Sequence, residues 1–212
     1  MQTVGYFYIR NLFFVQALRL HPELAGCPFW IERSGKVLAH SPCLERDGLH
    51  PGLSARRARR IAPQAHRLEY HPEDYRATHD LFCHIAHRLT PLVEPLNPGE
   101  IFLGLQGLDT GTAQTLVAEA RDMGFEATVA IAGSRLVARL AGRIHGPGCT
   151  VLEPSGQAAF LANRSIECLW SVPRKMREQL GRMGIHRVAD LQRISPPDAH
   201  RPLRSAGGTS AL

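Results

Sequence analysis

Residues 55–61 carry a dense group of positive charges that could contact phosphate. Four arginines stand within five positions: Arg56, Arg57, Arg59 and Arg60. Ser54 precedes them as a candidate N-cap, so the spacing predicts a short helix that ends near Ile61. Four guanidinium groups on so short a helix cannot all be buried, and a guanidinium pairs well with phosphate oxygens. The pattern predicts a surface that follows a nucleic-acid backbone, with a plain solvated helix face as the alternative.

A second group of reactive side chains is His79, Cys83 and His87, spaced four residues apart. This spacing places them on one face of a helix predicted over residues 72–89, and imidazole with thiolate suits zinc. The apolar residues of this helix are expected on another face, against the core: Leu81, Phe82, Ile85 and Leu89. His79 and His87 would lie about 12 Å apart along the axis, too far for one ion with bonds of about 2 Å. We therefore expect the three side chains to face away from the core and to hold no metal.

Three acidic residues, Glu94, Glu100 and Asp109, could form a catalytic centre only if the fold brought them together. Nothing in their spacing requires this, and ordinary surface charge is the alternative. Nucleophilic catalysis has no support, because the sequence contains no Gly-x-Ser-x-Gly pattern and signals no base for Cys149.

Composition limits the class of protein. The chain has 212 residues, of which 44% are hydrophobic and 21% are charged, so a buried core is expected rather than extended disorder. No apolar run reaches the roughly 18–20 residues that span a bilayer, and the first ten residues lack the pattern of a secretory signal. The five cysteines contain no Cys-x-x-Cys pair, which favours a reducing cytoplasm. The net charge is +6, with basic segments over 1–75 and 164–193, and this permits a nucleic-acid partner.

Hydrophobic periodicity and turn residues place the regular elements. Strands are predicted over residues 3–9, 29–31, 37–39, 101–105, 127–132 and 149–152. Helices are predicted over residues 12–20, 54–61, 72–89, 112–123 and 134–143, with short helical turns from residue 160 onward. The β-α-β-α-β order of the middle, closed by the first strand, is typical of an α+β, ferredoxin-like sheet with helices on one face.

Five short motifs follow the order found in Y-family DNA polymerases, the lesion-bypass class, which this sequence resembles over residues 3–193. The matching segments are residues 11–14, 41–53, 93–103, 134–141 and 169–191. The resemblance implies four parts: a palm over 1–10 and 71–160, a small fingers insert over 11–70, a short helix-hairpin-helix-like thumb over 161–194, and a disordered tail over 195–212.

The resemblance also identifies the positions where the family carries metal-binding carboxylates. The first motif has Ile9 and Asn11 at these positions, and the acid pair is reduced to Gly99 and Glu100. Isoleucine and glycine offer no side-chain oxygen to a hard cation, and a lone carboxylate cannot hold two divalent ions. We therefore predict that the catalytic set is not intact and that Glu100 is its remnant.

The nucleotide-binding positions of the family are changed as well. Its tyrosine and arginine of the fingers motif are Pro42 and Glu45, and its lysine before a proline is Gly146. Glu45 would repel a triphosphate. The aromatic pair of the first motif, Phe13 and Phe14, is retained, and without a nucleotide site it is more simply core.

In the thumb, the resemblance implies phosphate contact through backbone N–H groups of a tight turn. That turn is residues 171–173, and Pro173 has no N–H to donate. Arg174, Lys175 and Arg177 could supply charge instead, so we include them with the four fingers arginines as DNA-binding candidates. A purely structural thumb is the alternative.

Loss of the catalytic acids resembles the ImuB-like branch of the superfamily, whose members act as adaptors in bacterial mutagenesis. This implies a non-catalytic, DNA-binding or adaptor subunit in DNA repair, SOS mutagenesis and translesion synthesis, located in the cytoplasm at the bacterial nucleoid. The implied partners are primer–template DNA, bound without sequence specificity, and a replicative clamp, an error-prone polymerase or a recombinase-like accessory protein, with no membrane. No cofactor is expected. Mg²⁺ would be expected only if the chain retained residual polymerase activity.

The chain departs from that branch in length, because it leaves no room after the thumb for a little-finger domain of roughly 100 residues. Two alternatives stay open. One is a weak error-prone polymerase that uses Glu100 and an unidentified carboxylate. The other is a protein-interaction scaffold with no DNA contact, whose exposed apolar surface a partner covers.

Overall fold

The structure, a computed structural model, describes residues 2–106, 110–169 and 172–193. The chain divides after Glu153 into two units, which are treated separately below. The larger unit contains a five-stranded and a three-stranded sheet, whereas the described elements of the smaller unit are helical. None of the helices in the described ranges is long and apolar enough to cross a membrane.

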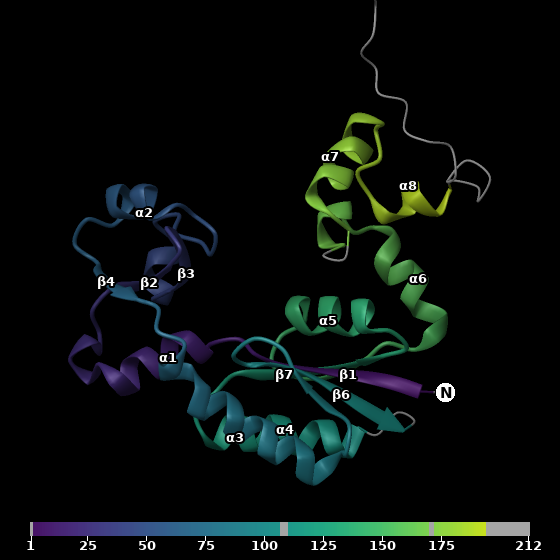
Figure 1. The fold of residues 1–212 in the computed structure, drawn as a ribbon, viewed down its shortest axis with the longest axis horizontal. Helices are drawn as coiled ribbons and strands as arrows, with labels where there is room; N and C mark the ends of the chain where they lie inside the picture. The colour runs from purple at the N-terminus through teal and green to yellow at the C-terminus, as the bar shows by residue number, and fades with distance from the viewer. Residues whose placement is uncertain (1, 107–109, 170–171, 194–212) are drawn as a thin grey trace, which may run out of the picture. The chain divides into compact units, whose positions relative to one another are not determined.

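The five-stranded sheet of the larger unit has β1 at its centre (Figure 1). Its strands in spatial order are β5 (Val93–Pro95), β6 (Glu100–Gln106), β1 (Gln2–Ile9), β7 (Ala127–Ala132) and β8 (Gly148–Val151). β1 is antiparallel to both neighbours, so Gly5 lies opposite Leu103 on one side and Ile131 on the other. β7 and β8 are parallel, and a helix connects them, as a parallel pair requires. The predicted α+β, ferredoxin-like fold is confirmed.

Helices cover both faces of this sheet (Figure 1). α3 (Glu73–Leu89) and α4 (Thr110–Asp122) pack on one face, and α5 (Arg135–Ile144) packs on the other. Gly142 of α5 lies so close to β1 that an added Cβ would stand 2.7 Å from the Tyr6 ring. The prediction that helices lie on one face is wrong. All six residues of β7 are buried, and a strand covered on both sides has such a near-continuous apolar run.

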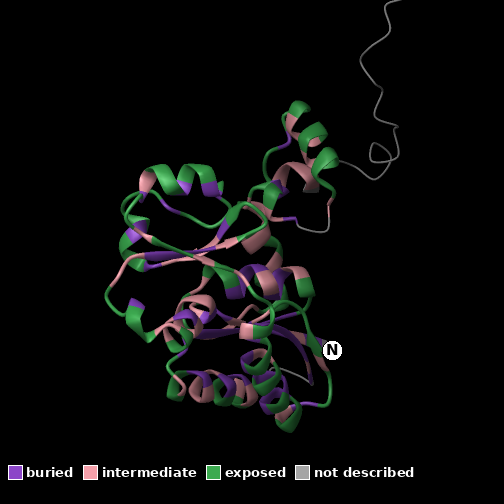
Figure 2. Cartoon of the chain, turned by 60° about the vertical axis from the view of Figure 1, so that its left-hand side comes forward, coloured by how far each residue is buried: buried purple, intermediate pink, exposed green. Residues whose placement is uncertain are grey.

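The buried face of α3 differs from the predicted one. Leu81 was expected in the core but is 45% exposed, whereas Cys83 is buried beside Phe82 in the main core. The prediction that Cys83 faces away from the core is therefore wrong. The buried arc of the helix centres on Phe82 and Ala86, and at about 100° per residue this includes position 83 and excludes position 81. In Figure 2 the buried positions of the sheets lie along their strands.

The three-stranded sheet of the larger unit has the spatial order β3-β2-β4. Its strands and the helices around it are α1 (Leu12–Leu20), η1 (Pro22–Leu24), β2 (Phe29–Arg33), β3 (Lys36–His40), η2 (Pro42–Glu45), α2 (Ala55–Ile61) and β4 (His66–Glu69). Ser34 and Gly35 form the turn between β2 and β3, both with positive φ. Trp30 packs with the α2 side of this sheet, whereas Phe29 and Ile31 pack with α1. β4 is an additional strand, parallel to β2.

The smaller unit is a set of short helices. They are α6 (Pro154–Ala162), η3 (Ile166–Cys168), α7 (Arg174–Arg182) and α8 (Val188–Gln192). Gly184 follows α7 with φ of +78°, and the next turn buries Ile185 and Val188. Residues 170–171, 195–212 and Asp109, on which earlier predictions fall, lie outside the described residues. The division into palm, fingers and thumb stays a prediction.

Candidate functional site

The end of β1 and the loop before β6 meet, and this brings together Ile9 and Gly99, two of the positions predicted to be degenerate metal positions. The backbone N–H of Ile9 donates to the carbonyl of Gly99 over 2.9 Å. Gly99 has φ of +76°, and a Cβ there would stand 2.9 Å from Cδ2 of Leu12 and 3.4 Å from Cβ of Ile9. The space that a second carboxylate would need is therefore filled by apolar side chains.

Asn11, at the other position of the first motif, is engaged in the fold. Its side-chain oxygen accepts the backbone N–H of Glu126 over 2.8 Å. The backbone N–H of Arg10 donates to the carbonyl of the same residue over 2.8 Å. Asn11 thus fastens the β1–α1 junction to the loop before β7.

Glu100 is the one carboxylate at these positions, and it is 5% exposed. The hydroxyl of Tyr6 donates to its Oε2 over 2.7 Å, and Nη2 of Arg139 donates to the same oxygen over 2.9 Å. Arg143 pairs with Oε1, which also receives a long contact of 3.5 Å from the Asn97 amide. Both oxygens of the carboxylate are therefore occupied, and two guanidinium groups surround one negative charge.

The Glu100 cluster stabilises the protonation states of its own members. It consists of Tyr6, Glu100, Arg139 and Arg143. Burial raises the pKa of Tyr6, with Glu100 adding to the increase, so its hydroxyl stays a donor. Burial alone would lower the pKa of Arg143, but Tyr6 and Glu100 beside it raise that pKa above its ordinary value. The Arg143 guanidinium also lies 5.0 Å from the Tyr8 ring centroid.

These residues do not fit a pair of divalent cations. Mg²⁺ is bound through several oxygen ligands, and the site offers one carboxylate that already pairs with two arginines. Glu94, considered above as part of a relocated acidic centre, forms an ion pair with Arg135. Across the part of the chain that the structure describes, no group of three or more His, Cys, Asp or Glu side chains could hold a metal ion.

His79 borders the degenerate site, which its sequence position did not indicate. Its Nδ1 accepts the backbone N–H of Gly99 over 3.4 Å, and its Nε2 lies 3.7 Å from Sγ of Cys83. Burial lowers the pKa of His79 and raises the pKa of the Cys83 thiol, so both groups are held in their neutral forms. His87 is exposed on the same helix. The pair positions the loop before β6.

The nucleotide-binding positions of the family are exposed or used in the fold. Glu45 is exposed at the end of η2, which begins with Pro42. The carbonyl of Gly146 accepts the hydroxyl of Thr128 over 3.0 Å.

The retained aromatic pair packs against other aromatic rings. Phe14 stacks on Phe29 with ring centroids 5.4 Å apart. Phe13 meets Tyr75 edge-on at 4.9 Å. The pair thus joins α1 to β2 of the three-stranded sheet and to helix α3.

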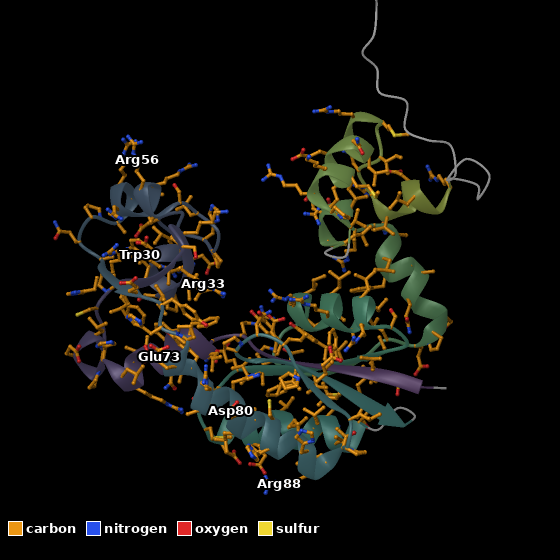
Figure 3. All side chains as sticks on the ribbon, in the orientation of Figure 1. Trp30, Arg33, Arg56, Glu73, Asp80 and Arg88 are labelled. Carbon is orange, nitrogen blue, oxygen red and sulfur yellow. The ribbon has the colours of Figure 1, made fainter. Side chains whose placement is uncertain are left out.

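The predicted arginine surface forms on α2. Ser54 caps the helix as predicted, since its hydroxyl accepts the backbone N–H of Arg57 over 3.4 Å. All four arginines are exposed, and Figure 3 shows Arg56 on the outer side of the helix. The nearest carboxylate contact is a loose one of 3.8 Å between Arg59 and Glu32. Most of this positive charge is therefore available to a ligand.

The three basic candidates of the smaller unit differ in availability. Arg177 is mostly buried and donates to the carbonyls of Leu169 and Val172 over 3.1 and 3.0 Å. Arg174 is exposed and pairs with Glu178 over 2.8 Å, one helical turn away. Lys175 is exposed. Arg177 thus has a structural contact, and the other two lie at the surface.

Sequence reasoning missed the Glu100 cluster as a unit. It placed residues 134–141 on a helix and Glu100 at a degenerate position, but it did not pair them. The available signal was the spacing of Arg135, Arg139 and Arg143, which puts three guanidinium groups on one face of α5. Their target could be found only from the sheet register.

Comparison with known proteins identifies the family of this chain. The model of the impB/mucB/samB family matches residues 9–143. A DNA polymerase IV from Exiguobacterium sibiricum is 31% identical over 186 residues, which are 82% of this chain and 52% of that protein. A DNA polymerase IV from Dehalococcoides mccartyi is 29% identical over 196 residues, 85% of this chain and 50% of that protein. The chain thus spans about half the length of the curated relatives it matches.

Solved structures show the same fold at lower identity. A Dbh ternary complex has a TM-score of 0.75 at 19% identity and covers 91% of this chain and 60% of its own. DinB from Sulfolobus solfataricus has a TM-score of 0.70 at 18% identity, with coverage of 91% and 60%. The predicted Y-family resemblance is confirmed, and the chain belongs to the impB/mucB/samB family.

Proposed function

We propose that this chain is a non-catalytic member of its family that binds primer–template DNA or bridges it to other proteins during DNA repair and translesion synthesis. In this role it resembles the ImuB-like branch. A replicative clamp, an error-prone polymerase or a recombinase-like accessory protein would be its protein partner. Bacterial cytoplasm, at the nucleoid, is the place where such a protein would act.

The state of Glu100 carries this proposal. Its carboxylate is buried and held by Tyr6, Arg139 and Arg143. To bind a cation, it would have to leave two guanidinium groups without their partner in a partly buried site, which is strongly unfavourable. Two-metal catalysis needs carboxylates that bridge both ions, and Ile9 and Gly99 supply no oxygen. The site thus favours a palm that keeps the family fold without its metals.

DNA contact is supported by charge and by the relatives. Several relatives are named DNA polymerase IV, and one structural neighbour is an insertion ternary complex of Dbh DNA polymerase. In this chain the exposed arginines of α2 are the densest candidates for phosphate contact. Each phosphate that they neutralise would release counterions, so affinity should fall steeply with salt.

Primer extension tests the non-catalytic part. We expect the wild-type chain to incorporate no nucleotide with Mg²⁺ or Mn²⁺, under conditions in which a DNA polymerase IV extends the same primer. Glu100→Gln should behave identically, since it keeps the shape of the side chain. Extension by the wild-type chain that disappears in Glu100→Gln would overturn the proposal in favour of a weak polymerase.

Fluorescence anisotropy with a labelled primer–template duplex tests the DNA-binding part. We expect binding whose logarithmic affinity falls linearly with the logarithm of salt concentration. The triple variant Arg56→Ala, Arg57→Ala, Arg60→Ala should weaken binding at least tenfold and flatten the salt slope. The matched control removes three exposed arginines of the α3–α4 layer: Arg76→Ala, Arg88→Ala and Arg121→Ala.

The control carries the same change in net charge, so equal losses in both variants would mean that no particular surface is used. Absence of binding at low salt would contradict DNA contact and favour the scaffold without DNA. Lys175→Ala and Arg174→Ala then test the smaller unit in the same assay, and a loss there would add its exposed charges to the surface.

A further inference from the structure

The outer edge of β4 carries backbone groups that the sheet does not use. The N–H of His66 donates to Pro28 and the N–H of Tyr70 donates to Glu32, each over 2.9 Å, so these alternate residues bond toward β2. In a parallel pair the intervening residues, Arg67 and Glu69, direct their N–H and C=O groups the other way. β4 is the last strand of its sheet, and no described strand pairs with that side. Such an edge is a template for an added strand.

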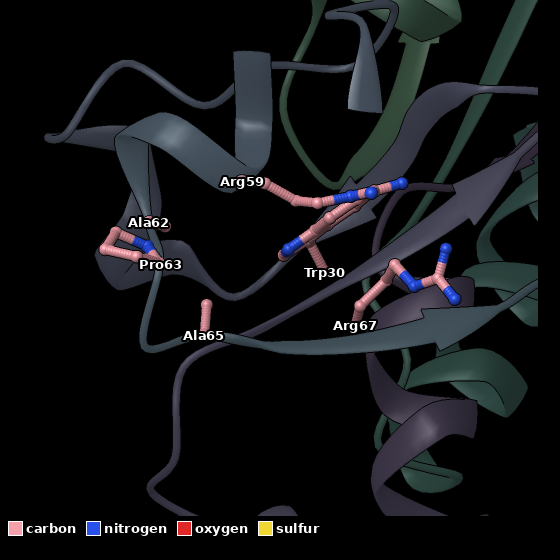
Figure 4. A pocket seen from close by; sticks show the side chains of 6 residues that line it. All are labelled: Trp30, Arg59, Ala62, Pro63, Ala65 and Arg67. Atoms are coloured by element: carbon pink, nitrogen blue, oxygen red, sulfur yellow. The ribbon is translucent and has the colours of Figure 1, made fainter. Parts of the chain in front are cut away.

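A cavity of about 470 Å³ lies on the α2 side of this edge (Figure 4). Trp30, 1% exposed, forms its floor, and the loop of Ala62, Pro63 and Ala65 closes one side. Two arginines complete the lining: Arg59 from α2 and Arg67 from β4.

The charge of this cavity is positive. Arg67 and Arg59 share one carboxylate oxygen of Glu32, at 3.0 and 3.8 Å. One negative charge faces two guanidinium groups, each with five N–H donors. An additional carboxylate in the cavity would therefore find donors that Glu32 leaves unused.

A smaller cavity, of about 230 Å³, lies on the other side of β4, against α1 and α3. Arg67 belongs to the lining of both cavities, so the two flank the same strand. Leu20, Leu68 and Tyr75 give this second cavity an apolar part, and Asp74 adds negative charge. An apolar side chain fits here better than an acidic one.

We propose that the outer edge of β4 docks an extended segment of a partner protein, which adds a fourth strand to this sheet. Side chains alternate between the two faces of a strand. The segment would place an acidic side chain between Arg59 and Arg67, and an adjacent apolar side chain against Leu20 and Leu68. The preferred partner sequence is therefore an alternation of acidic and apolar residues.

The edge suits a peptide better than a nucleic acid. A phosphodiester backbone offers acceptors only, so it could not satisfy the carbonyls of Arg67 and Glu69. This inference goes beyond the proposed function, because the edge is present whether or not the chain binds or extends DNA.

Binding of short fluorescent peptides to the full chain tests the proposal. The probe is a seven-residue peptide of alternating Glu and Val. A peptide of the same composition with the two residue types in separate blocks controls for charge, and alternating Lys and Val controls for its sign. We expect the alternating Glu–Val peptide to bind at least tenfold more tightly than either control. Equal binding of the block peptide, or no binding of the alternating one, would overturn the proposal.

Two variants test the site itself. Arg67→Gln should weaken the alternating peptide at least fivefold, whereas Arg56→Gln, an equal charge change outside the cavity, should leave its affinity within twofold. Glu69→Pro removes an N–H that points away from β2, which an edge strand tolerates. It should weaken the peptide to a similar extent with little change in melting temperature.

Three outcomes would contradict the assignment. Peptide binding unchanged in both Arg67→Gln and Glu69→Pro would place the peptide elsewhere. A primer–template duplex that loses as much affinity as the peptide in these variants would make the edge a nucleic-acid surface. A concentration-dependent dimer that Glu69→Pro abolishes would assign the edge to a second copy of the chain.

Discussion

Helix α2 carries four arginines and no acidic residue, and its buried positions are the small residues Ala55 and Ala58. Helix α5 carries three arginines on one face, and that face lies over a sheet with two glutamates, Glu94 and Glu100. The arginines of α2 project into solvent, whereas each arginine of α5 pairs with a carboxylate of the sheet: Arg139 and Arg143 with the buried Glu100, and Arg135 with the exposed Glu94. The same residue type thus has opposite uses in two helices of one unit.

The surface that a helix faces determines whether its arginines pair within the fold or remain free for a ligand. On α5 the three guanidinium groups pair with Glu94 and Glu100, so they belong to the stability of the fold. Among the described residues, the one carboxylate that pairs with an α2 arginine is Glu32, which Arg67 shares, so most of the α2 charge remains for a ligand. Arginine content by itself does not identify a nucleic-acid surface.

Among the variants that test this comparison, removal of the Glu100 carboxylate should give the largest loss in the free energy of unfolding. Glu100→Ala leaves Arg139, Arg143 and the Tyr6 hydroxyl without their shared acceptor. Loss of one partner from a buried ion pair costs about 3–5 kcal/mol, and we expect about 3 here because Arg143 is partly exposed. Urea denaturation followed by circular dichroism measures it.

Glu94→Ala is the matched control, because Glu94 pairs with an arginine of the same helix at an exposed position. It should lower the free energy of unfolding by no more than about 1 kcal/mol. Equal losses in the two variants would mean that the Glu100 cluster contributes no more than a surface pair.

Rebuilding the missing acid should fail for a steric reason, with the next largest effect. Gly99→Asp places a Cβ 2.9 Å from Leu12 at a φ of +76°. Gly35→Asp has nearly the same φ, +75°, with no atom within 4 Å of its Cβ, so it measures the backbone penalty alone. We expect Gly99→Asp to lower stability by about 1–2 kcal/mol more than Gly35→Asp. Similar values would show that Leu12 yields easily and that the acid was lost for another reason.

Much of the fold follows from local sequence patterns. Helix α1 was predicted at its observed bounds, because a mostly apolar segment ends shortly before Pro22. Ser54 and the alanines between the arginines also identified α2. The central sheet could be inferred because β7 and β6 are short apolar runs bounded by glycine.

What the sequence could not show depends on pairing between distant segments. β4 has the sequence His-Arg-Leu-Glu, which shows no alternation of apolar residues. An edge strand buries little side-chain surface, and β4 is held by its backbone hydrogen bonds to β2. Ile9 and Gly99 were identified from motif order, but the close approach of Leu12 to Gly99 required the structure. The arginine partners of Glu100 lie about forty residues later in the chain.

Alkaline pH should lower the free energy of unfolding through Tyr6 of the Glu100 cluster. Burial raises the pKa of Tyr6 in the folded state above its ordinary value of 10. The folded state therefore holds this proton after the unfolded state has lost it, and stability falls as pH rises above about 10. The slope for one proton is about 1.4 kcal/mol per pH unit. Urea denaturation between pH 9 and 11.5 should show a slope in Tyr6→Phe that is shallower than the wild-type slope by this share of one proton.

Tyr75→Phe gives the comparison for a tyrosine outside the cluster. Burial raises the pKa of Tyr75 to about 12, so this residue contributes a similar loss that ends near pH 12. Each of the two variants should reduce the slope of the free energy of unfolding against pH by the contribution of one proton. A Tyr6→Phe chain with the wild-type slope would contradict the placement of the Tyr6 proton.

The arginines of α2 should give the smallest change in stability. Arg56 and Arg60 are exposed, four residues apart and alike in charge, so they repel each other slightly. Arg56→Ala with Arg60→Ala removes this repulsion and introduces a better helix former, so the free energy of unfolding should change by less than about 0.5 kcal/mol. Urea denaturation measures this on the same samples used for DNA binding. A loss above about 1 kcal/mol would show that these arginines support the fold as those of α5 do. A weakened DNA affinity in the same variant would then report partial unfolding instead of a lost phosphate contact.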